Sequence, residues 1–227
     1  MRILVTRPLE DGPAIAGRLR AMGHEPVPAP LLTFEMLDAP EPDFTGVQAI
    51  LASSANGIRA LVRRSVRRDL PVFAVGPQTT EEAKNAGFTD VRNADGDAKA
   101  LAQAASQWAR PQDGALLHVC GEEAPGTLAD DLGARGFAVR RAVLYRMAAA
   151  TQLPDEVRES FATLDAVLFF SPRTTRIFGE LTRELSLSRL VALCISPATA
   201  TAADPLDFAE IRIAARPNQY ALLALVA

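Results

Sequence analysis

The sequence predicts an α/β protein of two similar doubly wound parallel-sheet domains, joined by a two-stranded linker. Two observations favour this fold class. Short apolar runs bounded by turn residues alternate with helical patterns throughout the 227 residues, which is typical of βαβ units. The chain also repeats itself, because residues 2–35 return without a gap as residues 115–148. A period this long is too large for a solenoid and fits two copies of one domain of about 110 residues.

Later segments extend the repeat. Segment 49–61, AILASSANGIRAL, matches segment 166–178, AVLFFSPRTTRIF, and segment 73–83 matches segment 193–203. Both copies therefore contain the same order of strand, turn and helix. Two similar domains with a cleft between them predict a ligand enclosed in that interdomain cleft.

Each element is predicted from its own pattern. Runs such as AVLFF and LVALCI are apolar throughout, which indicates strands covered by helices on both faces. Helix 10–22 carries Ile15, Leu19 and Met22 at helical spacing, and Gly23 follows where a left-handed cap is expected. In chain order, the predicted strands are 2–6, 25–28, 47–53, 71–75, 90–93, 115–120, 137–141, 165–170, 190–195 and 210–214. The predicted helices are 10–22, 55–67, 79–86, 97–109, 124–135, 153–162, 173–185, 198–203 and 217–226.

Segments 31–46 and 144–157 interrupt the pattern at equivalent places, since each begins apolar and ends polar with proline. We interpret their first parts as crossings between the domains. A tandem of halves, 1–113 and 114–227, is the competing partition. In our interpretation the first domain is discontinuous and consists of residues 1–33 plus 149–227. The second domain is 36–146, and the two crossings are 31–36 and 144–149.

Composition excludes several classes of function. A net charge of −3 and a pI of about 5.5 argue against an extended nucleic-acid-binding face. The start MRILVTRPLED lacks the pattern of a signal peptide, and no run approaches a membrane span. We therefore expect a cytoplasmic protein whose two cysteines, Cys120 and Cys194, are reduced thiols.

Ligands of doubly wound sheets bind beyond the carboxyl ends of the strands, where helix N-termini offer free N–H groups. The predicted strand ends are rich in hydroxyl groups, small residues and proline. Taken singly, each such Ser, Thr or Asn is also a common helix N-cap, and both interpretations stay open. The strand-end segments are Thr6-Arg7-Pro8, Ser53 to Asn56, Gly76 to Thr80, Cys120-Gly121-Glu122, Ser171 to Thr174 and Ser196 to Thr199.

No familiar catalytic or metal-binding motif occurs in the sequence. The histidines, His24 and His118, are expected to be core or surface residues. Cys120 lacks a partner histidine nearby, and the acids Glu122 and Glu123 fit a helix start as well as a catalytic pair. We therefore expect no metal and no cofactor, and a reaction that depends on positioning and hydrogen bonds.

Tyr145 is the most distinctive candidate because it lies in the second predicted crossing, where the first repeat has Leu32. A tyrosine facing the cleft could donate its phenolic proton to a leaving hydroxyl group. The alternative is a half-buried tyrosine that packs between domains. Tyr220, the other tyrosine, is expected to pack in the last helix.

The order and spacing of several short segments resemble the uroporphyrinogen-III synthase family over essentially the whole chain. These segments are ILVTRP (3–8), LASSANGI (51–58), AVGPQTTEEAKNAGF (74–88), VLYR (143–146), LFFSPRTTRIF (168–178) and ISPATATAA (195–203). The chain departs from the family at Ser196, which replaces the glycine of the second Gly-x-x-Thr turn and puts a left-handed backbone there in question. The ending, ARPNQYALLALVA, is also shorter and less polar than is usual in the family.

The resemblance implies a cofactor-independent lyase that cyclises the open-chain tetrapyrrole hydroxymethylbilane to uroporphyrinogen III, with loss of water and inversion of ring D. It implies a monomer that acts on this small molecule in tetrapyrrole biosynthesis, with transient handover from the preceding pathway enzyme. The functional tyrosine of the family falls on Tyr145. The expected substrate contacts are Arg7, Ser54, Asn56, Thr79, Ser171, Arg173 and Thr199.

Physical reasoning agrees with this function. The substrate carries eight carboxylates and so needs many donors rather than one strong base. Holding its two ends together would contribute up to about 7–11 kcal/mol. The alternative is a cytoplasmic two-domain anion sensor without catalysis, which would have no reason to carry Tyr145 and the paired threonine turns in these places.

Overall fold

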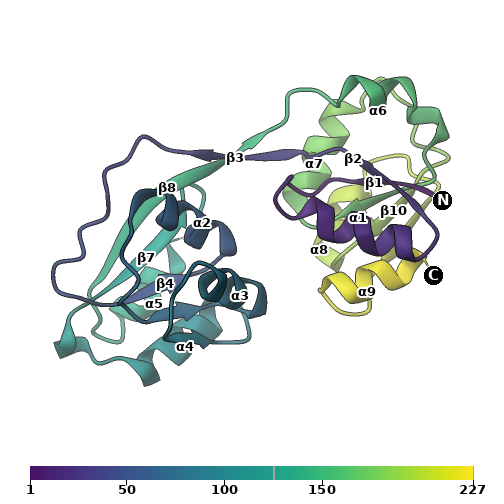
Figure 1. Ribbon diagram of the computed structural model, residues 1–227. Coiled ribbons are helices and arrows are strands. Elements are labelled where there is room, and N and C mark those ends of the chain that lie inside the picture. Colours follow the sequence, from purple (N-terminus) through teal and green to yellow (C-terminus); the bar gives the residue numbers. More distant parts are fainter. Residues whose placement is uncertain (125, 227) are drawn as a thin grey trace. The chain divides into compact units, whose positions relative to one another are not determined.

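The computed structural model describes residues 1–124 and 126–226. Contacts divide the chain into two compact units, which we call unit 1 (Met1–Thr33 and Ala148–Ala227) and unit 2 (Phe34–Met147). Each unit contains one sheet flanked by helices (Figure 1). Neighbouring strands pair in parallel in both sheets, except that the edge strand at residues 32–36 runs antiparallel to its neighbour. The predicted α/β class with parallel sheets is confirmed.

Unit 1 has the strand order β11-β10-β9-β1-β2. The helices that start at Pro172 and Pro197 each follow a serine N-cap, as the strand-end segments predicted, because serine caps the free N–H groups and proline fits the first helical turn. Its strands are β1 (Arg2–Val5), β2 (Glu25–Pro28), β9 (Ala166–Phe169), β10 (Val191–Cys194) and β11 (Glu210–Ile213). Its helices are α1 (Gly12–Ala21), α6 (Asp155–Glu159), α7 (Pro172–Leu181), α8 (Pro197–Ala203) and α9 (Gln219–Leu223), with single 3₁₀ turns at Phe161–Thr163 and Ala224–Val226.

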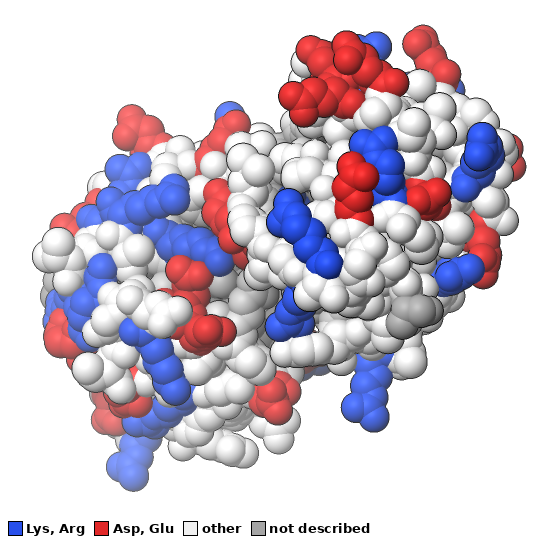
Figure 2. All heavy atoms as spheres, turned by 45° about the vertical axis from the view of Figure 1, so that its right-hand side comes forward, with Lys and Arg blue, Asp and Glu red and all other residues white. Residues whose placement is uncertain are grey.

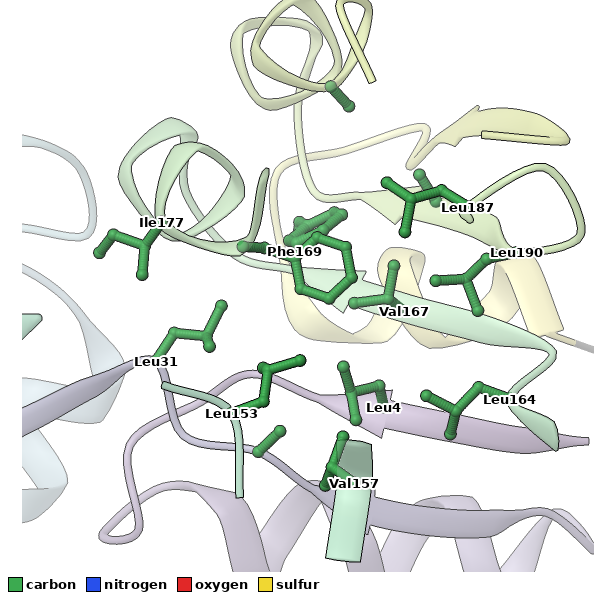
Figure 3. Packing of buried hydrophobic residues seen from close by; sticks show 14 of the residues in the cluster. Leu4, Leu31, Leu153, Val157, Leu164, Val167, Phe169, Ile177, Leu187 and Leu190 are labelled. Atoms are coloured by element: carbon green, nitrogen blue, oxygen red, sulfur yellow. The ribbon is translucent and has the colours of Figure 1, made fainter. Parts of the chain in front are cut away.

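Alternate side chains of these strands enter two different cores. Leu4, Val167 and Phe169 pack with helices α6, α7 and α8 on one face (Figure 3). Ile3 and Leu168 point to the other face and pack against α1 and α9. Because both faces are covered, the central strands β1, β9 and β10 are mostly continuous apolar runs instead of alternating ones.

Unit 2 has the strand order β3-β8-β7-β4-β5-β6. One face of its sheet packs against α2 and α3, and the other packs against α4 and α5. Its strands are β3 (Leu32–Met36), β4 (Val47–Ala52), β5 (Val72–Ala74), β6 (Val91–Asn93), β7 (Ala115–Gly121) and β8 (Val139–Ala149). Its helices are α2 (Ala55–Arg64), α3 (Pro77–Asn85), α4 (Ala98–Trp108) and α5 (Thr127–Gly133), with a 3₁₀ turn at Pro111–Asp113.

The two predicted crossings form a hydrogen-bonded pair of strands. β3 and β8 are neighbours in the sheet, and each of them contains residues of both units. The N–H of Leu37 donates to the carbonyl of Leu144, and the N–H of Ala150 donates to the carbonyl of Leu31. As the residue number rises along one strand, the number of the bonded residue in the other strand falls, so the two strands run antiparallel.

Several predicted boundaries were wrong. Strand 137–141 continues to Ala149, because the second crossing is part of the same strand. Helix 55–67 ends at Arg64, since Ser65 adopts an extended backbone and its hydroxyl accepts the N–H of Arg67. Helix 153–162 is divided at Ser160 into α6 and a 3₁₀ turn. Gly23 and Gly136 do have the left-handed backbone expected after a helix, with φ of 82° and 84°.

Two surface properties bear on the excluded functions. No helix in the described part of the chain is both long enough and apolar enough to cross a membrane. Basic and acidic side chains are interspersed on the face drawn in Figure 2. That face therefore offers no continuous basic surface of the kind that follows a nucleic-acid backbone.

Glycine at position 57 permits close packing of α2 on the sheet of unit 2. A Cβ atom at Gly57 would lie 2.5 Å from the carbonyl oxygen of Val119, whereas one at Gly17 of α1 would meet no atom within 4 Å. We expect Gly57→Ala to destabilise the protein by about 1–3 kcal/mol through overpacking. The matched control, Gly17→Ala, should be neutral or stabilising by up to about 1 kcal/mol. Thermal unfolding followed by circular dichroism measures both, and equal midpoints would contradict the close approach.

Candidate active site

The strand order of unit 2 predicts where a ligand would bind. From β4 the sheet grows through β5 and β6 on one side and through β7 and β8 on the other. The order therefore reverses between β4 and β7, and ligands of doubly wound sheets bind outside the carboxyl ends of the strands at such a point. Ser53 and Ser54 follow β4 here, and Gly121 ends β7.

A cavity of about 350 Å³ opens at this position. Its volume lies at the lower end of the range for small-molecule sites, and every lining residue belongs to unit 2. The polar lining groups are hydroxyl, imidazole and carboxyl groups. The lining consists of Ser53, Ser54, Ala98, His118, Gly121, Glu123, Ala124, Thr127, Leu128, Tyr145 and Met147.

Tyr145 contributes a phenolic hydroxyl group to the cavity. Its side chain is only 7% exposed, and its ring stacks on Phe34 with centroids 5.1 Å apart. The hydroxyl lies 3.0 Å from the Oγ atom of Ser54. Burial raises the pKa of Tyr145, the hydrogen bond to Ser54 partly offsets this, and the nearby Cys120 and Glu123 raise it further. The phenol is therefore protonated at neutral pH and able to donate.

A β-bulge directs Tyr145 into the cavity. The pairing of β7 with β8 shifts between Cys120 and Gly121, so that Cys120 faces Val143 but Gly121 faces Tyr145. The bulge places the consecutive residues Leu144 and Tyr145 in the same buried cluster, although neighbours in a strand normally point to opposite faces. A Cβ atom at Gly121 would lie 2.9 Å from the tyrosine ring, so glycine makes room for it.

The structure brings Ser54 and Asn56 to the same end of the sheet. Ser54 is the N-cap of α2, where its Oγ accepts the N–H of Asn56, so the cap interpretation of this serine is correct. The same oxygen nevertheless reaches Tyr145, because a hydroxyl group has two lone pairs and one proton. The side chain of Asn56 bonds to Arg59 and to the sulfur of Met147, a cavity residue.

His118 is the residue of this cavity that sequence reasoning missed. It is 2% exposed, as a core histidine would be, but it also lines the cavity, and its Nε2 lies 2.9 Å from the Oγ of Ser53. Burial, with the positive charge of Arg141 second, lowers the pKa of His118 to about 4. A polar residue two positions before the end of the apolar strand ALLHVC was the available signal.

Thr79 is buried in the first turn of α3, after the N-cap Gly76.

Neither Gly-x-x-Thr-type turn begins with a left-handed backbone. Gly76 has φ −165° and Ser196 has φ −155°, and both are extended conformations open to any residue. Serine at position 196 adds a hydroxyl that accepts the N–H of Thr199, a cap that Gly76 cannot supply.

The remaining predicted residues lie in unit 1. Arg7 follows β1, with its guanidinium 4.5 Å from the ring centre of Phe170 and 3.6 Å from Asp11. Ser171 caps α7 by accepting the N–H of Thr174, and Thr199 is fully buried in the first turn of α8. Arg173 is half-buried in the first turn of α7. The cap interpretation is therefore correct for Ser171.

Reactive and metal-binding groups are sparse in the described residues. Cys120 and Cys194 are buried free thiols, and burial raises the pKa of Cys194 to about 12. Across residues 1–124 and 126–226, no three His, Cys, Asp or Glu side chains are grouped so that they could hold a metal ion.

The fold and the candidate site together indicate a class of protein. The chain has two doubly wound α/β units, and unit 2 carries a small cavity lined by hydroxyl, imidazole and carboxyl groups at its switch point. That combination is typical of proteins that bind small molecules.

Comparison with known proteins identifies the family. The model of the family described as uroporphyrinogen-III synthase HemD matches residues 13–224, and the chain belongs to this family. Uroporphyrinogen-III synthetase from Helicobacter pylori is similar in structure, with a TM-score of 0.69 at 17% identity, over 100% of this chain and 98% of that one. A mutant uroporphyrinogen III synthase from Thermus thermophilus gives 0.55 at 20% identity, over 100% and 97%. These likenesses show the fold, and no curated protein matches the sequence.

His118 should make stability depend on pH. Its pKa in the folded protein, about 4, lies below the ordinary value of 6.5, so the unfolded chain binds the proton more tightly. The stability that the neutral imidazole contributes is complete above pH 6.5 and is lost as the pH falls toward 4. We expect this loss to reach about 3 kcal/mol.

Urea unfolding at pH 7, 5.5 and 4.5 measures the effect. His118→Gln removes this titration and should flatten the dependence. A dependence that is equally steep in wild type and His118→Gln would show that carboxyl groups alone cause it.

Proposed function

We propose that this protein is a hydro-lyase that cyclises hydroxymethylbilane to uroporphyrinogen III, with inversion of ring D and no added metal or cofactor. Membership of the uroporphyrinogen-III synthase family supports the overall reaction. The observation that carries the assignment to this chain is the buried, protonated hydroxyl of Tyr145 in the cavity at the switch point of unit 2. The protein would act in the cytoplasm as a monomer and receive its substrate from the preceding pathway enzyme.

Tyr145 would assist the first chemical step. The substrate must lose a hydroxyl group, a poor leaving group unless it is protonated as it departs. A phenol whose pKa is raised by burial remains a donor at neutral pH. Ser54, 3.0 Å from the phenolic oxygen, would hold it in position when the cavity is empty.

Binding would depend on many modest contacts. Ser54, Asn56 and Thr79 of unit 2 would contribute donors for the substrate carboxylates, and so would the strand-end residues of unit 1. Free N–H groups at the starts of α2, α3, α7 and α8 supply further donors, since helix N-termini favour anions. The unit 1 candidates are Arg7, Ser171, Arg173 and Thr199.

Product identity tests the function directly. We expect the purified protein to convert hydroxymethylbilane to the type III isomer at an unchanged rate after treatment with a chelator. The uncatalysed cyclisation gives the type I isomer, so the isomers are separated and quantified by liquid chromatography. Formation of type I alone, at the rate seen without protein, would exclude the proposed activity.

The role of Tyr145 is tested by Tyr145→Phe. General-acid assistance typically contributes about 10²–10⁴-fold, and water in the cavity can replace part of it, so we expect kcat to fall by about 10²-fold with little change in KM. Tyr220→Phe is the matched control, because Tyr220 is 73% exposed and its ring lies against Arg18. Wild-type turnover in folded Tyr145→Phe would reduce the tyrosine to a packing role.

A further inference from the structure

Two adjacent serines hold two polar groups on the wall of one cavity. Ser53 pairs with His118, at 2.9 Å, and Ser54 pairs with Tyr145, at 3.0 Å. The imidazole comes from β7 and the phenol from the neighbouring strand β8. Both groups line the same cavity of about 350 Å³, so a ligand that fills it would contact both.

Strand β7 explains how an imidazole reaches the cavity from a buried strand. Leu117 and Val119 pack on the α2 side of the sheet, and Leu116 packs on the α4 and α5 side. His118 shares a face with Leu116, because residues two apart in a strand do so. It therefore lies between the sheet and the starts of α4 and α5, where Ala98 and Thr127 also line the cavity.

The surroundings keep this imidazole neutral. Burial lowers the pKa of His118 most, and the positive charge of Arg141 on β8 lowers it further. The titratable groups that line the cavity with it are Tyr145 on β8 and Glu123 after β7. Ala98 of α4 and Thr127 and Leu128 of α5 contribute no charge. A neutral imidazole has one donor and one acceptor nitrogen, so pairing of Nε2 with Ser53 leaves Nδ1 with the complementary role.

We propose that His118 contacts the substrate in this cavity and that its neutral imidazole accepts a hydrogen bond from the N–H of the pyrrole ring that loses the hydroxyl group. The inference rests on the proposed function and names a residue for the same reaction. Nε2–H then donates to the Oγ of Ser53, and Nδ1 carries the accepting lone pair. A cavity of this size takes one substituted pyrrole and not the whole tetrapyrrole.

This arrangement suits the step in which the substrate loses its hydroxyl group as water. The carbon–oxygen bond breaks, its electron pair leaves with the oxygen, and the oxygen takes the proton of Tyr145 and departs as water. Positive charge then spreads over the pyrrole and makes its N–H a stronger donor to His118. The interaction is stronger in the transition state than in the bound substrate, which is the condition for acceleration. The proton released from carbon at ring closure restores the phenol, so the net loss is one water.

Two substitutions separate this role from packing. His118→Phe keeps a ring of similar size and removes both nitrogens, whereas His118→Gln keeps a neutral donor and acceptor. Packing alone would favour phenylalanine over the buried amide. We expect the reverse in activity, with kcat/KM lowered about tenfold or more by His118→Phe and by a smaller factor in His118→Gln. His24→Gln is the control and should retain wild-type activity.

Nuclear magnetic resonance supplies a readout that does not depend on turnover. The chain has only two histidines, so ¹⁵N-histidine labelling gives two imidazole spin systems. We expect the ring nitrogens of His118 to report the neutral Nε2–H form and to shift when uroporphyrinogen III, kept reduced and anaerobic, is added. The His24 signals should not move.

Several outcomes distinguish the two proposals. A wild-type protein that forms the type III isomer, with His118→Phe equally active or with His118 signals unchanged by bound product, overturns the role of His118 and leaves the function intact. Folded variants in which glutamine is no better than phenylalanine overturn it as well. A wild-type protein without type III activity overturns the proposed function and this role with it.

Discussion

The candidate site depends on strand β8, which pairs with a different neighbour in each of its two halves. Its first half pairs in parallel with β7 inside the sheet of unit 2, and its second half pairs with β3 and continues into unit 1. The bulge beside Gly121 lies where one role changes to the other. It turns Tyr145 toward Ser54 without breaking the ladder, because the N–H of Glu122 still donates to the carbonyl of Tyr145. Three residues accommodate Tyr145 at this bulge: Gly121 leaves room for its ring, Phe34 stacks on the ring, and Ser54 bonds to its hydroxyl group.

The internal repeat of the sequence corresponds to a shared strand order in the two sheets. Under the sequence correspondence, β1 and β2 match β7 and β8, whereas β9, β10 and β11 match β4, β5 and β6. Replacing each strand of unit 1 by its match turns the order β2-β1-β9-β10-β11 into β8-β7-β4-β5-β6, which is the order in unit 2 apart from its additional edge strand, β3. Matched strands therefore occupy the same positions, although the chain visits them in a different order. The switch points correspond too, so each unit places helix N-termini beside the central strands.

The elements that could be predicted are those determined by local patterns. Each predicted strand has a counterpart in the structure. The central strands were the clearest, because burial on both faces leaves uninterrupted apolar runs. The endings of helices at Arg64 and Ser160 were missed, since side-chain bonds and packing decide them. The bulge could not be predicted, because it is a relation between two strands that are distant in sequence. His118 was missed for a related reason. A lone histidine in an apolar strand signals only burial, and the cavity beside it is formed by the serines that follow β4 and by residues of β8 and α5.

The polar groups of the cavity are chiefly neutral, and the substrate explains why that suits the reaction. Eight carboxylates make hydroxymethylbilane strongly anionic, so a buried positive charge beside the reacting ring would attract carboxylates into the place that the pyrrole must occupy. Neutral phenol and imidazole groups avoid that attraction, because they carry no charge when the substrate binds and respond to charge only as it develops. Burial keeps them neutral, as it raises the pKa of Tyr145 and lowers that of His118. The same desolvation that stabilises the core thus sets the protonation states on which the chemistry depends.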